Sequence, residues 1–255
     1  MNSAEPVKLD FPGATIEKGD GYYLVRLEHI AQFLSSAPLG EGLLTADLIL
    51  SGQVSPRACL TDPLSYLREL AAQLGVPDRP DGIGVIGLLT AVDHRDLQVT
   101  SLAESGVTVT TLATVGVDHG SSPRDKDVGG HAEPAIAKAD PLTRPGAINL
   151  GTINPGTINL VTLVDASLST GALVRASTLA TEAKTLALAE AGLRTRQGHI
   201  ATGTATDATV VGHSGRGSQF AYAGSATLLG WLVGQTVYQS VTRGLAAYNS
   251  RKRRH

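Results

Sequence analysis

Residues 158–165 read INLVTLVD, and residues 169–192 read STGALVRASTLATEAKTLALAEAG. The first stretch is a short apolar run with β-branched residues, which is the pattern of a buried strand. The second stretch is rich in Ala and Leu, which favours a helix over about 172–191, and Gly192 is a suitable residue to end it. A buried strand followed directly by a long helix is therefore the starting point for predicting the fold.

Apolar and β-branched patterns predict further strands on both sides of this pair, over residues 22–27, 43–50, 83–90, 107–115 and 200–212. Asp62 and Pro63 suit the start of a helix that runs to about residue 74. A last helix is predicted over about 225–248, with an apolar stripe from Leu229 to Leu245. Because strands and helices do not alternate strictly, the sequence predicts an α+β fold, with a mixed or antiparallel sheet layered with helices.

The chain has 255 residues, of which 42% are hydrophobic and only 4% aromatic, so Ala, Val, Leu and Thr must fill the core. We expect a single domain over residues 1–255, because strands are predicted directly before and after a long Gly- and Pro-containing connection. That connection, about 118–145, is expected to be a flexible loop, and the pattern leaves a lid and a disordered insertion both open. Residues of about 250–255 are expected to form a disordered basic tail.

Charge and cysteine usage narrow the function classes. The formal net charge of −2 gives no general reason to expect nucleic acid or an anionic membrane as a partner. A single cysteine, Cys59, excludes a disulfide within the chain. No apolar run reaches the ~18 residues that cross a bilayer, and the first 20 residues carry charges that do not suit a signal peptide. We therefore expect a cytoplasmic protein; its oligomeric state does not follow from the sequence.

A five-residue repeat covers residues 148–160 and reads INLGT, INPGT, INL. Asn154 precedes Pro155 and Gly156, a strong turn signal. Amide and hydroxyl groups can both donate and accept hydrogen bonds. The repeat is therefore a candidate cradle for a substrate rich in amides, and its candidate binding residues are Asn149, Asn154, Thr157 and Asn159. The alternative is a hairpin of Asn and Thr that binds no ligand.

Residues 180–184 read ATEAK, inside the predicted long helix. Thr181 and Thr185 are four apart and share a helix face, whereas Glu182 and Lys184 are two apart and do not face each other. If Glu182 or Lys184 turns inward, it needs a partner from another part of the chain. The alternative is that both charges are solvated.

Residues 201–207 read ATGTATD. In an extended segment its three threonines, among them Thr204, would share one face. Asp207 at the end of this segment could act as a general base or orient one. It could equally be an acidic residue of a turn.

The order and wording of GTINPGTIN, ATEAK and ATGTATD resemble the adenosylcobinamide amidohydrolase (CbiZ) family. The resemblance is strong over about residues 151–230 and weaker over GLLTA at 87–91 and over 107–116. It implies hydrolysis of the aminopropanol amide bond of adenosylcobinamide to adenosylcobyric acid, in corrinoid salvage for cobalamin synthesis. On this reading the corrinoid is the small-molecule partner, its cobalt belongs to the substrate, and the enzyme needs no cofactor.

Two other functions remain open at this stage. One is a corrinoid-binding module without hydrolysis, which would not depend on Glu182, Lys184 or Asp207. The other is an amidohydrolase of a different amide on the same scaffold, because a fold does not fix a function.

Amide hydrolysis needs an activated nucleophile, a group that stabilises the oxyanion and an acid for the leaving amine. In the first hypothesis Glu182 or Asp207 activates water, while Lys184 or an Asn of the repeat holds the oxyanion. Lys184 could also protonate the leaving amine. In the second hypothesis the nucleophile is Thr152 or Thr157, each of which follows a glycine, after cleavage of the chain before it.

The histidines offer a third chemistry. Asp93 and His94 are adjacent, and together they could act as an Asp–His base at the mouth of the site. Both are candidate substrate-binding residues, as are Thr181 and Thr204. His119 and His131 fall in the expected loop. There is no HExxH motif and no pair of histidines with tight ligand spacing, so no metal site is expected.

Overall fold

The computed structural model describes residues 5–55, 62–76, 84–118, 120–125 and 156–253. Its strands are β1 (Val7–Lys8), β2 (Ala14–Gly19), β3 (Tyr22–Ser35), β4 (Gly42–Gln53), β5 (Gly84–Thr90), β6 (Gln98–Glu104), β7 (Val107–Val115), β8 (Ile158–Val164), β9 (Ser167–Leu168), β10 (Ala208–His213) and β11 (Gln219–Phe220). Its helices are α1 (Pro63–Gln73), α2 (Thr170–Glu190), α3 (Leu228–Lys252) and a 3-10 turn, η1 (His94–Asp96).

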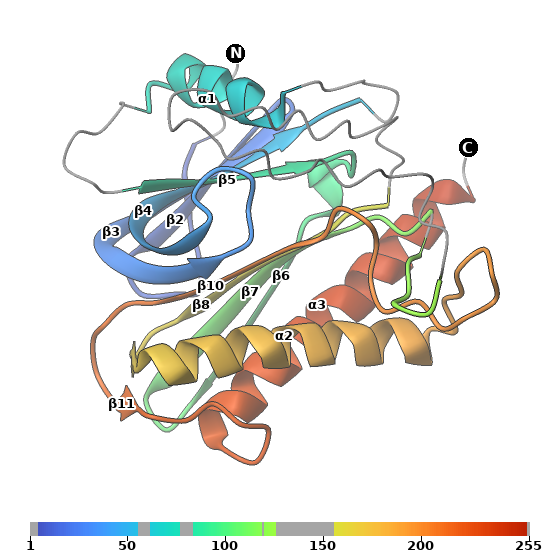
Figure 1. Cartoon of the computed structure of the whole chain (residues 1–255). Coiled ribbons are helices and arrows are strands. Elements are labelled where there is room, and N and C mark those ends of the chain that lie inside the picture. The colour runs from blue at the N-terminus through green and yellow to red at the C-terminus, as the bar shows by residue number, and fades with distance from the viewer. Residues whose placement is uncertain (1–4, 56–61, 77–83, 119, 126–155, 254–255) are drawn as a thin grey trace, which may run out of the picture.

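The elements lie in four layers, with α1 outside one layer of strands and α2 and α3 outside the other (Figure 1). Nine strands form one sheet in the order β1-β2-β3-β10-β8-β7-β6, and β4 pairs with both β3 and β5. The pairs β8–β10 and β4–β5 are parallel, whereas the other pairs of this sheet are antiparallel. The predicted α+β class, with a mixed sheet layered with helices, is confirmed.

Strand β3 connects the two layers of the sheet. Its pairing with β4 shifts register between Arg26 and Ala31, and such an irregularity bends a strand. The part of β3 beyond this point pairs with β10, from Gln32 to Ser35. One long strand thus continues from the layer that α1 covers into the layer that α2 and α3 cover.

All seven residues of β8 are buried. Leu160 and Val164 belong to the cluster that also contains the inner faces of α2 and α3. Val161 and Leu163 belong to the cluster between the two sheet layers. A strand that is covered on both faces is apolar throughout rather than alternating, which explains the run INLVTLV.

Hydroxyl groups inside the helix-facing core satisfy one another. Thr111 Oγ1 lies 3.0 Å from Thr162 Oγ1 and 3.0 Å from Thr236 Oγ1 of α3. Ser240 Oγ donates to Thr100 Oγ1 at 2.8 Å. These contacts join α3 to β6 and β7, and β7 to β8. They explain how threonine can fill a core that has few aromatic residues.

Most predicted elements are present, with shifted ends. Asp62 accepts hydrogen bonds from the amides of Leu64 and Ser65 and caps α1 as expected. Helix α3 extends to Lys252, three residues into the expected tail, and residues 254–255 lie outside the described residues. Five strands had no predicted counterpart, namely β1, β2, β6, β9 and β11. None of the described helices combines the length and apolar character that crossing a membrane requires.

The strand predicted over residues 200–212 is wrong in its first half. Only Ala208–His213 forms a strand, β10. Residues 204–207 form a turn in which the side chain of Asp207 accepts a hydrogen bond from the backbone amide of Thr204 at 3.0 Å. A short acidic side chain that bonds nearby backbone amides favours a turn over a ladder.

Strands from before and after the expected loop are neighbours in the sheet, since β7 pairs with β8 and β3 with β10. This pairing supports our proposal that the chain forms a single domain. Most of the expected loop, and with it the question of a lid, lies outside the described residues.

Two glycines of α3 provide a matched test of this packing. A β-carbon at Gly244 would lie 2.5 Å from a methyl carbon of buried Val115, whereas one at Gly234 would meet nothing within 4 Å. Overpacking costs ~1–3 kcal/mol, and alanine gains up to about 1 kcal/mol over glycine inside a helix. We expect Gly244→Ala to lower the thermal unfolding midpoint and Gly234→Ala to leave it unchanged or raise it. Equal midpoints for both variants would contradict this packing of α3 on β7.

Candidate active site

A buried ion pair lies beside the start of β8. Lys184 points inward from α2, and its Nζ lies 2.5 Å from Oδ2 of Asp207. The side chains are only 8% and 12% exposed. Of the two charges in ATEAK, Lys184 is therefore the one that turns inward, and Asp207 from the third motif is its partner.

Asp207 is surrounded by donors. Its Oδ1 accepts from the amide of Ile158 at 2.9 Å and from the hydroxyl of Thr204. Its Oδ2 accepts from the amide of Thr204 and from Lys184. A β-carbon at Gly203 would lie 2.6 Å from Oδ2 and 3.1 Å from Nζ of Lys184, so glycine there permits the close approach. These contacts hold α2, the turn and the first residue of β8 together.

Thr157 directly precedes β8 and is only 2% exposed. Its Oγ1 lies 2.6 Å from Oγ1 of Thr206, and the Thr206 hydroxyl donates to the carbonyl oxygen of Gly156 at 3.2 Å. Asp207, which follows Thr206, bonds Ile158, which follows Thr157. The structure thus brings the predicted residues Thr157, Thr204, Lys184 and Asp207 together, and it adds Thr206 to them.

The threonines of ATGTATD do not share one face, contrary to the expectation for an extended segment. Thr204 bonds Asp207, Thr206 bonds Thr157, and Thr202 Oγ1 points to the carbonyl of Ser121 at 3.5 Å. The turn at 204–207 separates their directions. Thr206 was within the motif, but only the long-range contact with Thr157 distinguishes it from its neighbours.

Asn159 points between the two sheet layers and is 2% exposed. Its Nδ2 donates to the carbonyl of Leu89 at the end of β5, at 2.8 Å. Its Oδ1 has no partner among the described residues, and the same is true of Oγ1 of Thr114, its register partner on β7. Two buried oxygen atoms without a hydrogen-bond partner among the described residues therefore lie on neighbouring strands, and Asn159 is two residues beyond Thr157 along β8.

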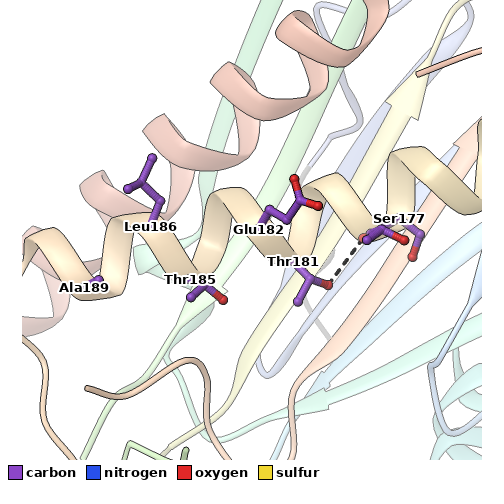
Figure 2. A pocket seen from close by; sticks show the side chains of 7 residues that line it. Ser177, Thr181, Glu182, Thr185, Leu186 and Ala189 are labelled. Atoms are coloured by element: carbon purple, nitrogen blue, oxygen red, sulfur yellow. Dashed lines mark hydrogen bonds between the residues drawn. The ribbon is translucent and has the colours of Figure 1, made fainter. Parts of the chain in front are cut away.

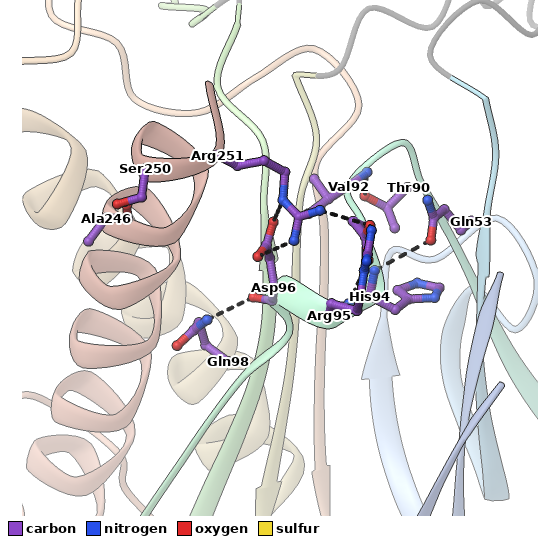
Figure 3. A network of polar contacts seen from close by, with 11 residues as sticks. Gln53, Thr90, Val92, His94, Arg95, Asp96, Gln98, Ala246, Ser250 and Arg251 are labelled. Atoms are coloured by element: carbon purple, nitrogen blue, oxygen red, sulfur yellow. Dashed lines mark hydrogen bonds and ion pairs between the residues drawn. The ribbon is translucent and has the colours of Figure 1, made fainter. Parts of the chain in front are cut away.

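Asp93 and His94 belong to the turn between β5 and β6. Figure 3 shows Arg251 reaching from α3 to Asp96 of this turn. Arg251 donates to Asp93 Oδ2 at 2.9 Å and to Asp96 Oδ1 at 2.7 Å. The hydrogen bonds from Arg95 hold the pKa of Asp93 well below its usual range, assisted by the charge of Arg251. Asp93 is thus an anion that anchors the end of α3.

His94 is buried at 5% exposure, and its Nε2 lies 3.1 Å from Oγ of Ser51. Its ring meets that of Tyr23 edge-on, with centroids 5.1 Å apart. Burial lowers the pKa of His94 to about 4, so the ring is neutral at neutral pH. Asp93 accepts hydrogen bonds from Arg95 and Arg251 rather than from the His94 ring, so the structure does not show the expected Asp–His base.

Thr181 and Glu182 face away from this cluster. Both are exposed and line an open groove of about 690 Å³ on the outer face of α2, together with Thr185 (Figure 2). Glu182 pairs with Arg175 at 2.6 Å, and this hydrogen bond lowers the pKa of the carboxyl group. The groove lies on the outer face of α2, whereas the buried ion pair and the unpaired oxygens of Asn159 and Thr114 lie on the other side of this helix.

Asn149 and Asn154, and also His119 and His131, lie outside the described residues. Within the described part of the chain, no three His, Cys, Asp or Glu side chains gather where they could hold a metal ion.

Several solved structures are similar to this one at low sequence identity. A β-aminopeptidase of Burkholderia sp. is 12% identical, with 95% of this chain and 82% of that chain covered and a TM-score of 0.45. An L-aminopeptidase D-Ala-esterase/amidase from Ochrobactrum anthropi is 11% identical, with 95% and 82% covered and a TM-score of 0.39. The PH0078 protein from Pyrococcus horikoshii OT3 is 13% identical, with 90% and 81% covered and a TM-score of 0.39.

No curated protein matches the sequence. The family described as adenosylcobinamide amidohydrolase matches residues 11–253, which is nearly the whole chain and includes all of the described cluster around Lys184. The chain therefore belongs to the adenosylcobinamide amidohydrolase family.

Proposed function

We propose that the hydrolysis of adenosylcobinamide takes place at the start of β8, beside the buried pair of Lys184 and Asp207. The family to which the chain belongs hydrolyses an amide bond of this corrinoid in salvage. The observation that carries the location is the ion pair itself, at 2.5 Å and with both side chains nearly buried. A buried pair costs desolvation that its attraction does not always recover, and we therefore interpret this pair as functional.

Lys184 is our candidate for stabilising the oxyanion. An ammonium group has three donors, and Asp207 takes one of them. A preorganised cation in a site that excludes water stabilises developing negative charge far better than it does in water. Asp207 already accepts four hydrogen bonds. We therefore assign it the positioning of Lys184 rather than the removal of a proton.

Asn159 and Thr114 are our candidates for holding amide groups of the substrate. Oδ1 of Asn159 can accept a hydrogen bond from an amide N–H, and the hydroxyl of Thr114 can donate or accept. Leaving such buried groups unpaired costs ~1–3 kcal/mol each, and a bound substrate with matching groups would recover that cost. Asn149 and Asn154 stay as predictions for the same role.

The expected roles of three other residues change in this proposal. His94 and Asp93 serve the packing of the β5–β6 turn, because one is a neutral buried ring and the other anchors Arg251. Glu182 is left out, because it is exposed and paired with Arg175. The expectation that Glu182 activates water is tested directly by measuring turnover in a variant that lacks this carboxylate.

The first test removes the buried charges. Lys184→Met alone leaves Asp207 buried without its partner, which costs ~3–5 kcal/mol of stability. The double variant Lys184→Met/Asp207→Asn removes both charges. We expect the double variant to fold, as measured by circular dichroism, and to lose at least about 100-fold in kcat for release of adenosylcobyric acid.

Binding of adenosylcobinamide, measured by calorimetry, completes this test. Retained binding with lost turnover supports a catalytic role for the pair. Wild-type turnover in the folded double variant would sink the proposed location.

Glu182→Gln is the matched control, because Glu182 lies two residues from Lys184 on the same helix but on its outer face. We expect kcat within about twofold of the wild type, because Glu182 is exposed and its substitution removes only the surface ion pair with Arg175. A loss of turnover with retained binding would instead restore Glu182 as the base that activates water.

The buried His94 makes stability depend on pH. Its pKa is about 4 in the folded chain and 6.5 in an exposed histidine, so the unfolded state takes up the proton first on acidification. The contribution is complete above about pH 6.5 and is lost as the pH falls toward 4.

Between pH 7.5 and pH 5 this contribution falls by about 2 kcal/mol. Urea titrations at the two pH values measure the free energy of unfolding of both proteins. We expect this free energy to fall in the wild type by about 2 kcal/mol more than it falls in His94→Gln. Parallel losses in both proteins would show that His94 is not buried as a neutral ring.

A further inference from the structure

We propose that the chain cleaves its own Gly156–Thr157 peptide bond, and that Thr157, freed at the amino end of β8, is the nucleophile of the hydrolysis. This inference rests on the proposed location of the reaction and gives it a nucleophile. The sequence offered Thr152 and Thr157 as equivalent candidates after a glycine. The contacts of Thr157 carry the inference for the second of them.

The hydroxyl of Thr157 is held in a directed chain of hydrogen bonds. Thr206 donates to the carbonyl oxygen of Gly156 at 3.2 Å and lies 2.6 Å from Oγ1 of Thr157. A hydroxyl has one proton, so while Thr206 donates to the carbonyl, Thr157 must donate to Thr206. One side chain thus polarises the carbonyl group before Thr157 and accepts the proton of the nearest nucleophile.

The backbone on both sides of the bond is suited to this reaction. Gly156 has no side chain to obstruct its carbonyl carbon. The carbonyl of Thr157 accepts from the amide of Gly116 at 3.0 Å, and the amide of Ile158 donates to Asp207 at 2.9 Å. These two bonds hold the carbonyl group of Thr157 and the residue that follows it in place. The nitrogen of Thr157 belongs to the bond that breaks, and it can move away from the carbonyl carbon of Gly156. Burial at 2% exposure keeps bulk water from competing before the ester forms.

The cleavage has two steps. Oγ1 of Thr157 adds to the carbonyl carbon of Gly156, while its proton passes to Thr206 and the proton of Thr206 passes to the carbonyl oxygen. The hydroxyl of this tetrahedral intermediate then gives its proton to the nitrogen of Thr157 as the carbon–nitrogen bond breaks. The result is an ester between Gly156 and Oγ1 and a free α-amine on Thr157. Water then hydrolyses the ester, which leaves a carboxylate on Gly156 and restores the Thr157 hydroxyl. The net change is the addition of one water.

The freed residue has what an amide hydrolase needs. Its α-amine lies on the same residue as the hydroxyl and can accept the hydroxyl proton, the arrangement known for N-terminal threonine nucleophiles. In turnover, Oγ1 attacks the substrate amide carbon, the amine passes the proton to aminopropanol, and water releases adenosylcobyric acid from the ester.

The test begins with the full-length chain carrying its own termini, purified and analysed under denaturing conditions by intact mass and N-terminal sequencing. We expect two fragments whose masses sum to the chain plus one water, the second beginning at Thr157. Two results would overturn the inference: a second fragment that begins at Thr152, or an uncleaved chain that hydrolyses adenosylcobinamide.

Variants separate self-cleavage from processing by another protease. Thr157→Ala should remain one chain and lose turnover by more than 1000-fold, whereas Thr157→Ser should still be cleaved. Thr206→Val keeps the shape of its side chain and should slow the appearance of the fragments. Thr178→Ala, an exposed threonine on α2, is the matched control and should be cleaved like the wild type. Cleavage of Thr157→Ala at the same bond would mean that another protease makes the cut.

The two proposals fail differently. An intact, active Thr157→Ala chain overturns the nucleophile but leaves the dependence on Lys184 standing. A cleaved Lys184→Met/Asp207→Asn chain that turns over normally overturns the location assigned to Lys184 but leaves the cleavage standing.

Discussion

The contact between Lys184 and Asp207 is the constraint on which this end of the molecule depends. Each charge could be buried only because the other was, and the carboxylate is saturated by a helix side chain, a neighbouring hydroxyl and two backbone amides. The tight turn before β10, the glycine at 203 and the placement of the first residue of β8 follow from that saturation. In our proposal, function at this site cannot be separated from the local fold, because the same atoms serve both.

The layered sheet explains why such a polar cluster can exist within a largely aliphatic protein. Helices cover one face of the central strands and a second sheet layer covers the other, so water is excluded from both. Threonine suits this interior because its hydroxyl can find another hydroxyl across strands, as Thr111 does with Thr162 and Thr236. Asn159 and Thr114 differ, because each has a buried oxygen atom without a partner among the described residues, and for this reason we chose them as candidate substrate-binding residues.

The sequence predicted what local patterns determine. The Val/Thr run at 107–115, the Ala/Leu helix and the cap at Asp62 are encoded by neighbours in the chain, and all three are observed. The direction of Lys184 was left open because its partner lies 23 residues away, beyond any helical periodicity. The strand predicted at 200–207 failed because an alternating Thr pattern does not reveal that Asp207 bonds back to Thr204. For Asn149 and Asn154 the pattern remains the only guide.

The place of β8 within the sheet has a consequence for how the protein can be recovered after denaturation. This strand is hydrogen-bonded on one side to β7 and on the other to β10. Once the chain is cut before Thr157, β7 and β8 belong to different polypeptides, although the folded body is unchanged. Refolding then becomes a bimolecular process whose yield depends on concentration. The mature protein would owe its persistence to slow unfolding, because a dilute solution of its two pieces reassembles poorly.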